Sequence, residues 1–224
     1  SDAIEVLAEA RMTGLMGDAL AVTGVEVTIG EEERQISGDA VVLTTGGFAG
    51  DHNEVLGSHR PDLVNLPTTN GPWATGDGLQ AATEMGAKLV DMDQIQVHPT
   101  GLLDASNPHA GSVLLGPEAL RASGGILVNG EGKRFVDELK RRDQVTAAIR
   151  KQGTFLSRTF PGFEDSGGVG PVAYLVMDSA AVAEFGPTLF SFYRSRRLFH
   201  SVSGASDLAE VIGCAEESLT GTLA

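Results

Sequence analysis

Short apolar runs that are typical of strands alternate along this chain with segments that have helical spacing. Residues 21–30 alternate apolar with small or polar side chains, which predicts a strand. Residues 77–86 place three apolar side chains on one face and finish in Gly86, which predicts a helix. Because strands and helices are interleaved rather than grouped, the pattern predicts an α/β or α+β fold.

The other predicted elements continue this alternation. Strands are predicted at 39–45, 93–98, 124–129 and 172–177, the first of them a buried strand that ends in a glycine turn. Helices are predicted at 51–56, 138–152, 206–212 and 215–223, with Asp51 and Ser206 as N-caps. Residues 167–170 are predicted to be a flexible connection.

Composition excludes several classes of function. The formal net charge of −14 argues against binding to a nucleic-acid backbone. Cys214 is the only cysteine, so neither an intramolecular disulfide nor a cysteine-based metal site is predicted, and the histidines show no paired ligand spacing. No metal site, membrane span or targeting segment is expected. The first residues read as the middle of a β-rich segment, so we expect an internal piece of a longer protein.

Two glycine-containing clusters could lie close to a ligand. Thr44 to Phe48 includes Gly46 and Gly47, which would let backbone amides approach an anion or would simply end a strand. Asp77 lies between two glycines at a predicted helix start, where it could accept hydrogen bonds from a ribityl or ribose hydroxyl or act as an N-cap. The dinucleotide fingerprint G-x-G-x-x-G is absent.

A second group of residues could perform acid–base chemistry. Glu118 and Arg121 are three residues apart and can pair on one helical face, and Arg142 follows after a further strand and turn. Such a group is either a surface ion pair or a relay in which a carboxylate reprotonates an arginine beside an anionic substrate. His98, at the end of a predicted strand, is either structural or part of a ligand-binding rim.

Five stretches in series resemble the soluble fumarate reductase flavoproteins, a branch of the succinate dehydrogenase/fumarate reductase family, with the yeast and trypanosomatid enzymes as the nearest type. They are VVLTTGGF, PTTNGPWATGDG, VDMDQIQVHPTG, PEALRASGGILVNGEGKRFVDELKRRD and SDLAEVIG. They occur in the family's order between residues 41 and 213. Several motifs in a fixed order are far more specific than one glycine pattern.

The resemblance implies a role for each residue of these clusters. Arg142 would give a proton to the substrate carbon, and Arg121 and Glu118 would form the relay behind it. His98 would bind a substrate carboxylate, with Glu118 also beside the substrate. The implied cofactor is FAD, contacted by Asp77, Gly46 and Gly47, and the implied reaction is reduction of fumarate to succinate.

The resemblance also implies a domain arrangement. Residues 1–93 would be part of an FAD-binding, Rossmann-like domain without its phosphate fingerprint, and residues 94–224 would be an α+β clamp domain. Further flavin-domain segments would complete the site, so the isolated chain is expected to be inactive. An NADH-linked electron donor is expected, and relatives are mitochondrial, glycosomal or cytosolic.

Two departures from the family pattern and two alternatives qualify this interpretation. Pro117 stands where many relatives have a substrate-contacting threonine, which puts that contact in doubt, and Ala122 replaces a common glycine. The alternatives are a reductase of another activated alkene, such as urocanate or an enoate, and a clamp-domain module without redox activity.

Overall fold

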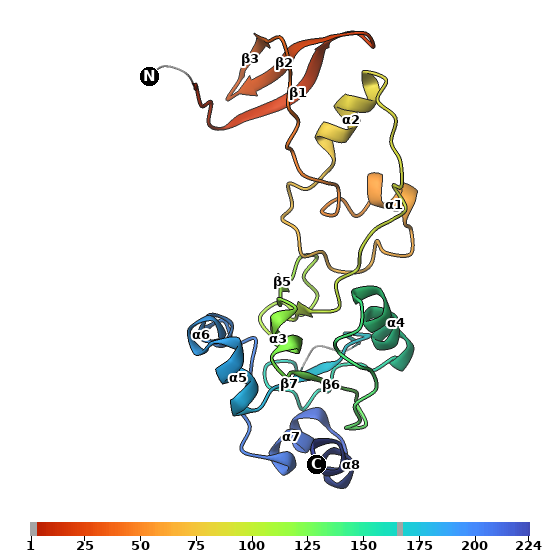
Figure 1. Cartoon of the computed structure of the whole chain (residues 1–224), viewed down its shortest axis with the longest axis vertical. Helices are drawn as coiled ribbons and strands as arrows, with labels where there is room; N and C mark the ends of the chain where they lie inside the picture. The colour runs from red at the N-terminus through yellow and green to blue at the C-terminus, as the bar shows by residue number, and fades with distance from the viewer. Residues whose placement is uncertain (1–3, 165–167) are drawn as a thin grey trace. The chain divides into compact units, whose positions relative to one another are not determined.

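A computed structural model describes residues 4–164 and 168–224 of the chain. The chain divides into two compact units, the first ending at Ile95 and the second beginning at Gln96 (Figure 1). Both units mix helices with short antiparallel strands, so the observed architecture is of the α+β kind. Residue 167 of the predicted flexible connection lies outside the described residues.

The first unit contains a three-stranded antiparallel sheet in the order β1-β2-β3. The strands are β1 (Ala10–Gly17), β2 (Val22–Ile29) and β3 (Glu32–Ser37). The central strand β2 confirms the strand predicted at 21–30. Val27 of β2 is paired with Met12 on one side and Arg34 on the other, and only 7% of it is exposed.

Two helices complete the first unit. They are α1 (Val55–His59) and α2 (Asp77–Glu84), and α2 contacts strand β1. The helix predicted at 77–86 is confirmed, and Gly86 after it has a φ of 90°, a backbone conformation that glycine adopts readily. The helix predicted at 51–56 begins later, at Val55 with Glu54 as its N-cap, and the Asp51 carboxylate accepts backbone amide hydrogen bonds from residues 53–55.

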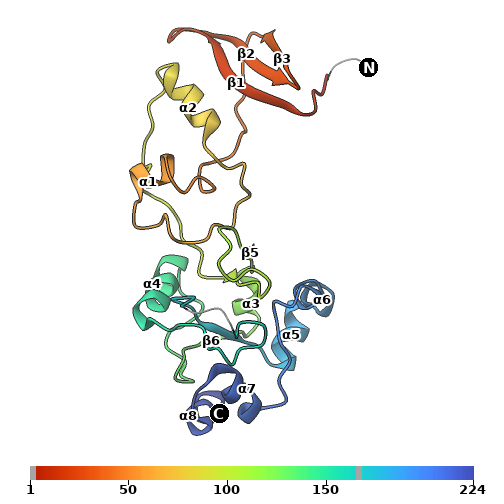
Figure 2. The same cartoon turned by 180° about the vertical axis from the view of Figure 1, so that it is seen from behind.

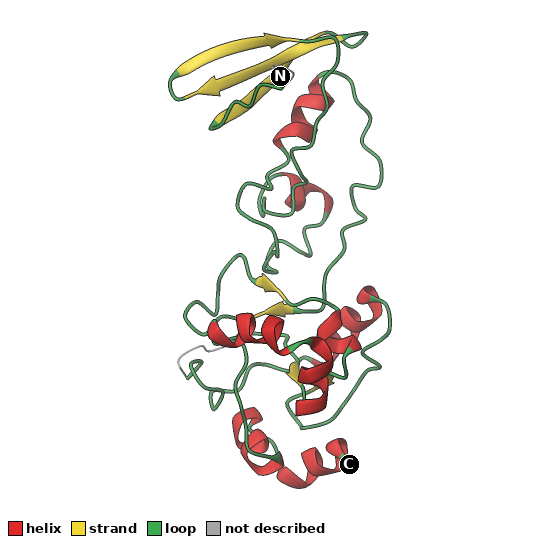
Figure 3. Cartoon of the chain, turned by 60° about the vertical axis from the view of Figure 1, so that its left-hand side comes forward, coloured by secondary structure: helices red, strands yellow, loops and turns green. Residues whose placement is uncertain are grey.

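Two predicted strands of the first ninety-eight residues are wrong. Residues 39–45 form no strand, and Val42 in the middle of the run is 83% exposed, because none of the described strands pairs with this segment. Residues 93–98 also form no strand. Asp91 has a φ of 55°, and the amides of Gln94 and Ile95 close tight turns, which bends the chain instead of extending it. Both segments lie in the long loops drawn green in Figure 3.

The second unit contains two short sheets and most of the helices (Figures 1 and 2). Its strands pair antiparallel as β4 (Gly101–Leu102) with β5 (Leu114–Leu115) and as β6 (Ile126–Val128) with β7 (Tyr174–Val176). Its helices are α3 (Ala119–Ala122), α4 (Arg142–Gln152), α5 (Ser179–Phe185), α6 (Pro187–Ser195), α7 (Ala205–Ile212) and α8 (Glu216–Leu223).

Strands β6 and β7 lie at the centre of the second unit and confirm the strands predicted at 124–129 and 172–177. Val128 packs with residues of α7 and α8, while Leu127 packs with Val145 and Ile149 of α4. Successive residues of a strand point to opposite faces, so β6 is covered by different helices on its two sides. Helix α4 is therefore anchored to the sheet through its buried face.

Two helix boundaries differ from the predictions. Helix α4 begins at Arg142 rather than at residue 138, because the Glu138 side chain is buried and accepts a hydrogen bond from the Leu127 amide at 2.8 Å. Helix α7 begins at Ala205 with Gly204 as its N-cap, so Ser206 is not the cap. The helix predicted at 215–223 is confirmed as α8.

Replacing Leu219 by alanine is expected to lower the free energy of unfolding by about 3 kcal/mol, because the lost side chain leaves a cavity that the core fills only in part. Leu219 of α8 is fully buried against Val128 and Tyr174. The matched control is Leu223→Ala, since Leu223 lies on the same helix and is 44% exposed. Denaturant unfolding should show a small change for the control, and equal losses for both variants would contradict this packing.

Candidate active site

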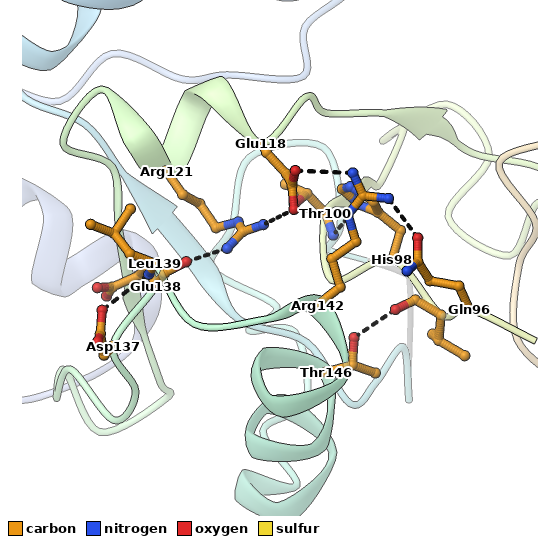
Figure 4. Close-up of polar contacts among 11 residues, drawn as sticks. Gln96, His98, Thr100, Glu118, Arg121, Asp137, Glu138, Leu139, Arg142 and Thr146 are labelled. Atoms are coloured by element: carbon orange, nitrogen blue, oxygen red, sulfur yellow. Dashed lines mark hydrogen bonds and ion pairs between the residues drawn. The ribbon is translucent and has the colours of Figure 1, made fainter.

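Arg142 and Glu118 form a two-point ion pair in the second unit (Figure 4). The Arg142 Nε donates to Glu118 Oε1 at 2.8 Å, and its Nη2 donates to Oε2 at 2.9 Å. Arg142 is the first residue of α4 and Glu118 immediately precedes α3, so two separate elements supply the pair. Two parallel hydrogen bonds fix the plane of the guanidinium as well as its position.

The charges of this pair stabilise each other. Hydrogen bonding to Arg142 lowers the pKa of Glu118 to about 2, and the positive charges of Arg142 and Arg121 act in the same direction. The same hydrogen bond raises the pKa of Arg142 above its ordinary value. Both side chains are partly exposed, at 36% for Arg142 and 48% for Glu118, so a ligand from solvent can reach them.

Arg121 lies on the other side of Glu118 and is buried. Its Nη2 donates to Glu118 Oε1 at 3.4 Å, and its Nη1 donates to the backbone carbonyl of Glu138. Only 3% of the Arg121 side chain is exposed. Within the described residues its Nε has no hydrogen-bond partner. Glu118 therefore connects the buried Arg121 with the partly exposed Arg142.

Glu138 holds the buried end of this series in place. Its carboxylate accepts hydrogen bonds from the Leu127 amide and from Arg134, whose Nη2 lies 2.5 Å from Oε2. Its backbone carbonyl meets Arg121. The buried Glu138 carboxylate is bonded both to strand β6 and to the exposed Arg134, and these bonds fix the loop in front of α4. The hydrogen bond from Arg121 to the Glu138 carbonyl depends on the position of that loop.

His98 lies beside the same group of charges. Its Nδ1 accepts a hydrogen bond from the Thr100 amide at 3.2 Å, so the neutral ring carries its proton on Nε2. Burial lowers the pKa of His98, and the positive charge of Arg142 lowers it further. A neutral imidazole with a free Nε2–H can donate a hydrogen bond to an anionic oxygen without adding another charge.

Gln96 and Thr146 also belong to this site, although neither was expected there. The Gln96 Oε1 accepts a hydrogen bond from Arg142 Nη1 at 2.5 Å, and the Thr146 Oγ1 donates to the Val97 carbonyl at 3.0 Å. The spacing of four residues between Arg142 and Thr146 places both on one face of a helix, which is a signal that could have found Thr146, whereas no spacing rule finds Gln96. They join the segment before His98 to helix α4.

The site residues expected to touch the cofactor lie in the first unit. Asp77 is the first residue of α2, and its carboxylate accepts a hydrogen bond from the Thr75 hydroxyl at 2.5 Å and faces Arg11 at 3.4 Å. Gly46 has a φ of 82°, and apart from the adjoining residues no described atom lies within 4 Å of where a Cβ would stand on Gly46 or Gly47. An open glycine backbone and a carboxylate acceptor at a helix start fit the phosphate, hydroxyl and ring groups of FAD.

Neither a cluster of metal ligands nor a membrane-spanning helix occurs in the part of the chain that the structure describes. Within residues 4–164 and 168–224 there is no group of three or more histidine, cysteine, aspartate or glutamate residues that could hold a metal ion. None of the helices described there combines the length and the apolar character that a bilayer crossing requires.

The sequence matches the family model described as "FAD binding domain" over residues 1–222. The chain therefore belongs to this family of FAD-binding domains, and FAD is the cofactor that defines it. The match covers nearly the whole chain, so it includes both units of the structure.

Several of the individual proteins that this chain resembles are fumarate reductases. Fumarate reductase of Schizosaccharomyces pombe is 34% identical over 226 residues, which cover 99% of this chain and 40% of that protein. Fumarate reductase 1 of Saccharomyces cerevisiae is 51% identical over 121 residues, which cover 54% of this chain and 26% of that protein. The chain thus spans less than half the length of these relatives.

A solved structure gives the same result for the fold. The open conformation of a flavocytochrome c3 fumarate reductase superposes with a TM-score of 0.63 at 26% sequence identity. The superposition covers 95% of this chain and 34% of that structure. The chain therefore shares its fold with about a third of that structure.

Proposed function

We propose that this chain supplies the proton-donating half of an active site that reduces fumarate to succinate with FAD. The observation on which the proposal rests is the series Arg121, Glu118 and Arg142, in which one carboxylate bridges a buried and an exposed arginine. The names of the two yeast relatives support fumarate as the substrate. The substrate is a dianion, and this group of residues concentrates positive charge in a chain of net charge −14.

When bound, FAD in its reduced form supplies the hydride that one alkene carbon requires. The Nε2–H of His98 donates a hydrogen bond to a substrate carboxylate, and the Arg142 charge stabilises the negative charge that develops on the other alkene carbon. Arg142 gives a proton to that carbon, so one hydride and one proton convert fumarate to succinate.

The proton that Arg142 loses must be replaced quickly, because a neutral guanidine is strongly basic. Glu118 touches Arg142 through two hydrogen bonds and Arg121 through one, so it can pass a proton from the buried to the exposed arginine. Glu118 is ionised at rest, since its pKa is about 2. In this proposal Glu118 takes up a proton from Arg121 and passes it to Arg142, but it does not carry a proton at rest.

The finer parts of the proposal concern the cofactor site, the domain arrangement and the segments of the longer protein outside this chain. Asp77, Gly46 and Gly47 would contact FAD, residues 1–93 would form part of the FAD-binding domain, and residues 94–224 would form the clamp domain. The remaining flavin-domain segments would supply the other carboxylate-binding groups. An NADH-linked electron donor would reduce the flavin.

The direct test of the proposed reaction uses the longer protein that contains this chain, with FAD bound. Reduced methyl viologen should be oxidised when fumarate is added, and one succinate should form for every two viologens oxidised, because each viologen gives one electron and fumarate takes up two. Parallel assays with urocanate and with an unsaturated monocarboxylate test the alternative substrates. Faster turnover of either one than of fumarate would replace fumarate as the substrate, and absence of bound FAD would favour a module without redox activity.

A further inference from the structure

Helix α4 and the segment before His98 are joined by contacts one helical turn apart. Arg142 and Thr146 are four residues apart on α4, which places them on the same face. The Arg142 Nη1 donates to the Gln96 side chain at 2.5 Å, and the Thr146 hydroxyl donates to the Val97 carbonyl at 3.0 Å (Figure 4). Two neighbouring residues of the segment are therefore held by two neighbouring turns of one helix.

The segment from Gln96 to His98 needs such an anchor because it belongs to no strand. A backbone without ladder hydrogen bonds is held only by the contacts that its own groups make. Gln96 is exposed and Val97 is half-buried, so burial alone does not fix them. The contact from Thr146 is to the backbone, which makes it independent of the side chain at position 97.

We propose that Thr146 is a positioning residue, which fixes the backbone before His98 on the helix that begins with Arg142. This inference rests on the proposed function, because it concerns the placement of a substrate-binding histidine relative to a proton donor. Thr146 is half-buried and touches neither Glu118 nor Arg121 through a hydrogen bond, so it acts through Val97.

Thr146 sets the spacing between Arg142 and His98, whose side chains are held by different hydrogen bonds. Arg142 is held by two hydrogen bonds to Glu118, and Thr146 takes part in neither of them. In the part of the chain that the structure describes, the His98 side chain accepts a hydrogen bond from the Thr100 amide at 3.2 Å. Loss of the Thr146 hydroxyl therefore loosens His98 much more than Arg142, and substrate binding suffers more than proton delivery.

The test compares Thr146→Val with Thr146→Ser in the longer, FAD-bound protein. Valine keeps the shape and removes the hydroxyl, whereas serine keeps the hydroxyl. Thr146→Val is expected to raise the KM for fumarate about tenfold and to change kcat less than about threefold. The reason is that the variant weakens binding of the substrate and of the transition state by the same amount. Thr146→Ser is expected to stay within about twofold of the unchanged protein in both constants.

The matched control is Thr222→Val, which removes a comparable hydroxyl. Thr222 of α8 donates to the Gly132 carbonyl at 2.7 Å and to the Ser218 carbonyl at 3.1 Å in the same unit, and neither of these partners belongs to the candidate site. The control should leave the KM unchanged. A Thr146→Val KM equal to that of the unchanged protein, or a Thr146→Ser KM as high as that of Thr146→Val, would overturn the inference while the proposed function stands. An unchanged protein that does not reduce fumarate would overturn both.

Discussion

Replacing Arg142 by alanine in the longer, FAD-bound protein is expected to lower fumarate turnover by about a thousandfold or more. Proton transfer by a placed acid contributes on the order of 10²–10⁴ in rate, and the same side chain also stabilises developing negative charge. Alanine removes both contributions at once. The FAD content should stay the same, because Arg142 lies in the second unit and the residues proposed to contact FAD lie in the first. Steady-state oxidation of methyl viologen measures the turnover, and the flavin absorbance of the purified protein measures the cofactor.

The neighbouring Arg141 provides the matched control for this variant. It is 76% exposed, and its ion pair is with Asp143 at 3.0 Å, not with Glu118. Arg141→Ala removes the same charge at the next position and should retain turnover within about threefold, because exposed ion pairs contribute little. Near-normal turnover of Arg142→Ala would refute the role of Arg142 as proton donor. Equal losses of turnover in both variants would mean that only the positive charge in this region matters, and not proton transfer by Arg142.

Glu118→Gln is expected to lower turnover by about a hundredfold, the lower end of the range for acid–base groups. Glutamine has the shape of glutamate but cannot take up and release the proton, and its amide group would face a donor of Arg142 where a carboxylate oxygen now accepts. The pKa of Glu118 is about 2, so the carboxylate is ionised in ordinary assay buffers. The pH profile of the unchanged protein should therefore show no titration of Glu118 near the usual glutamate value.

The control for Glu118→Gln is Glu131→Gln in the same unit. Glu131 is 72% exposed and is paired with Lys133 at 3.1 Å, so it has a similar partner without a second arginine. Its replacement should leave turnover unchanged. If Glu118→Gln also kept full turnover, the two arginines would not communicate through Glu118, and Arg142 would have to recover its proton from water.

Local sequence patterns predicted those parts of the fold that local interactions determine. The strand β2 and the helices α2 and α8 follow directly from apolar spacing. The run at 39–45 was predicted to be a buried strand, yet Val42 is exposed. An apolar run indicates that a segment can be buried, but it does not indicate which strand would pair with it. None of the described strands pairs with residues 39–45.

The candidate site shows the same division between local and distant contacts. The spacing of Glu118 and Arg121 predicted their pairing, and the structure gives it at 3.4 Å. The pair of Arg142 with Glu118 joins residues that are 24 positions apart, so no spacing rule predicts it. The contribution of Gln96 depends on how the loop before His98 meets α4, which only the three-dimensional arrangement reveals. The roles of these residues in catalysis stay predictions.

Reoxidation of the reduced flavin in a single turnover tests the proposed role of Arg142 most directly, because it separates the chemical step from electron supply and product release. The longer protein, with its FAD reduced under anaerobic conditions, would be mixed with fumarate in a stopped-flow instrument while the flavin absorbance is followed. The flavin of the unchanged protein should be reoxidised rapidly with one succinate formed per FAD, and that of Arg142→Ala should be reoxidised about a thousandfold more slowly. Equal reoxidation rates in the two proteins would contradict the proposal that Arg142 donates the proton.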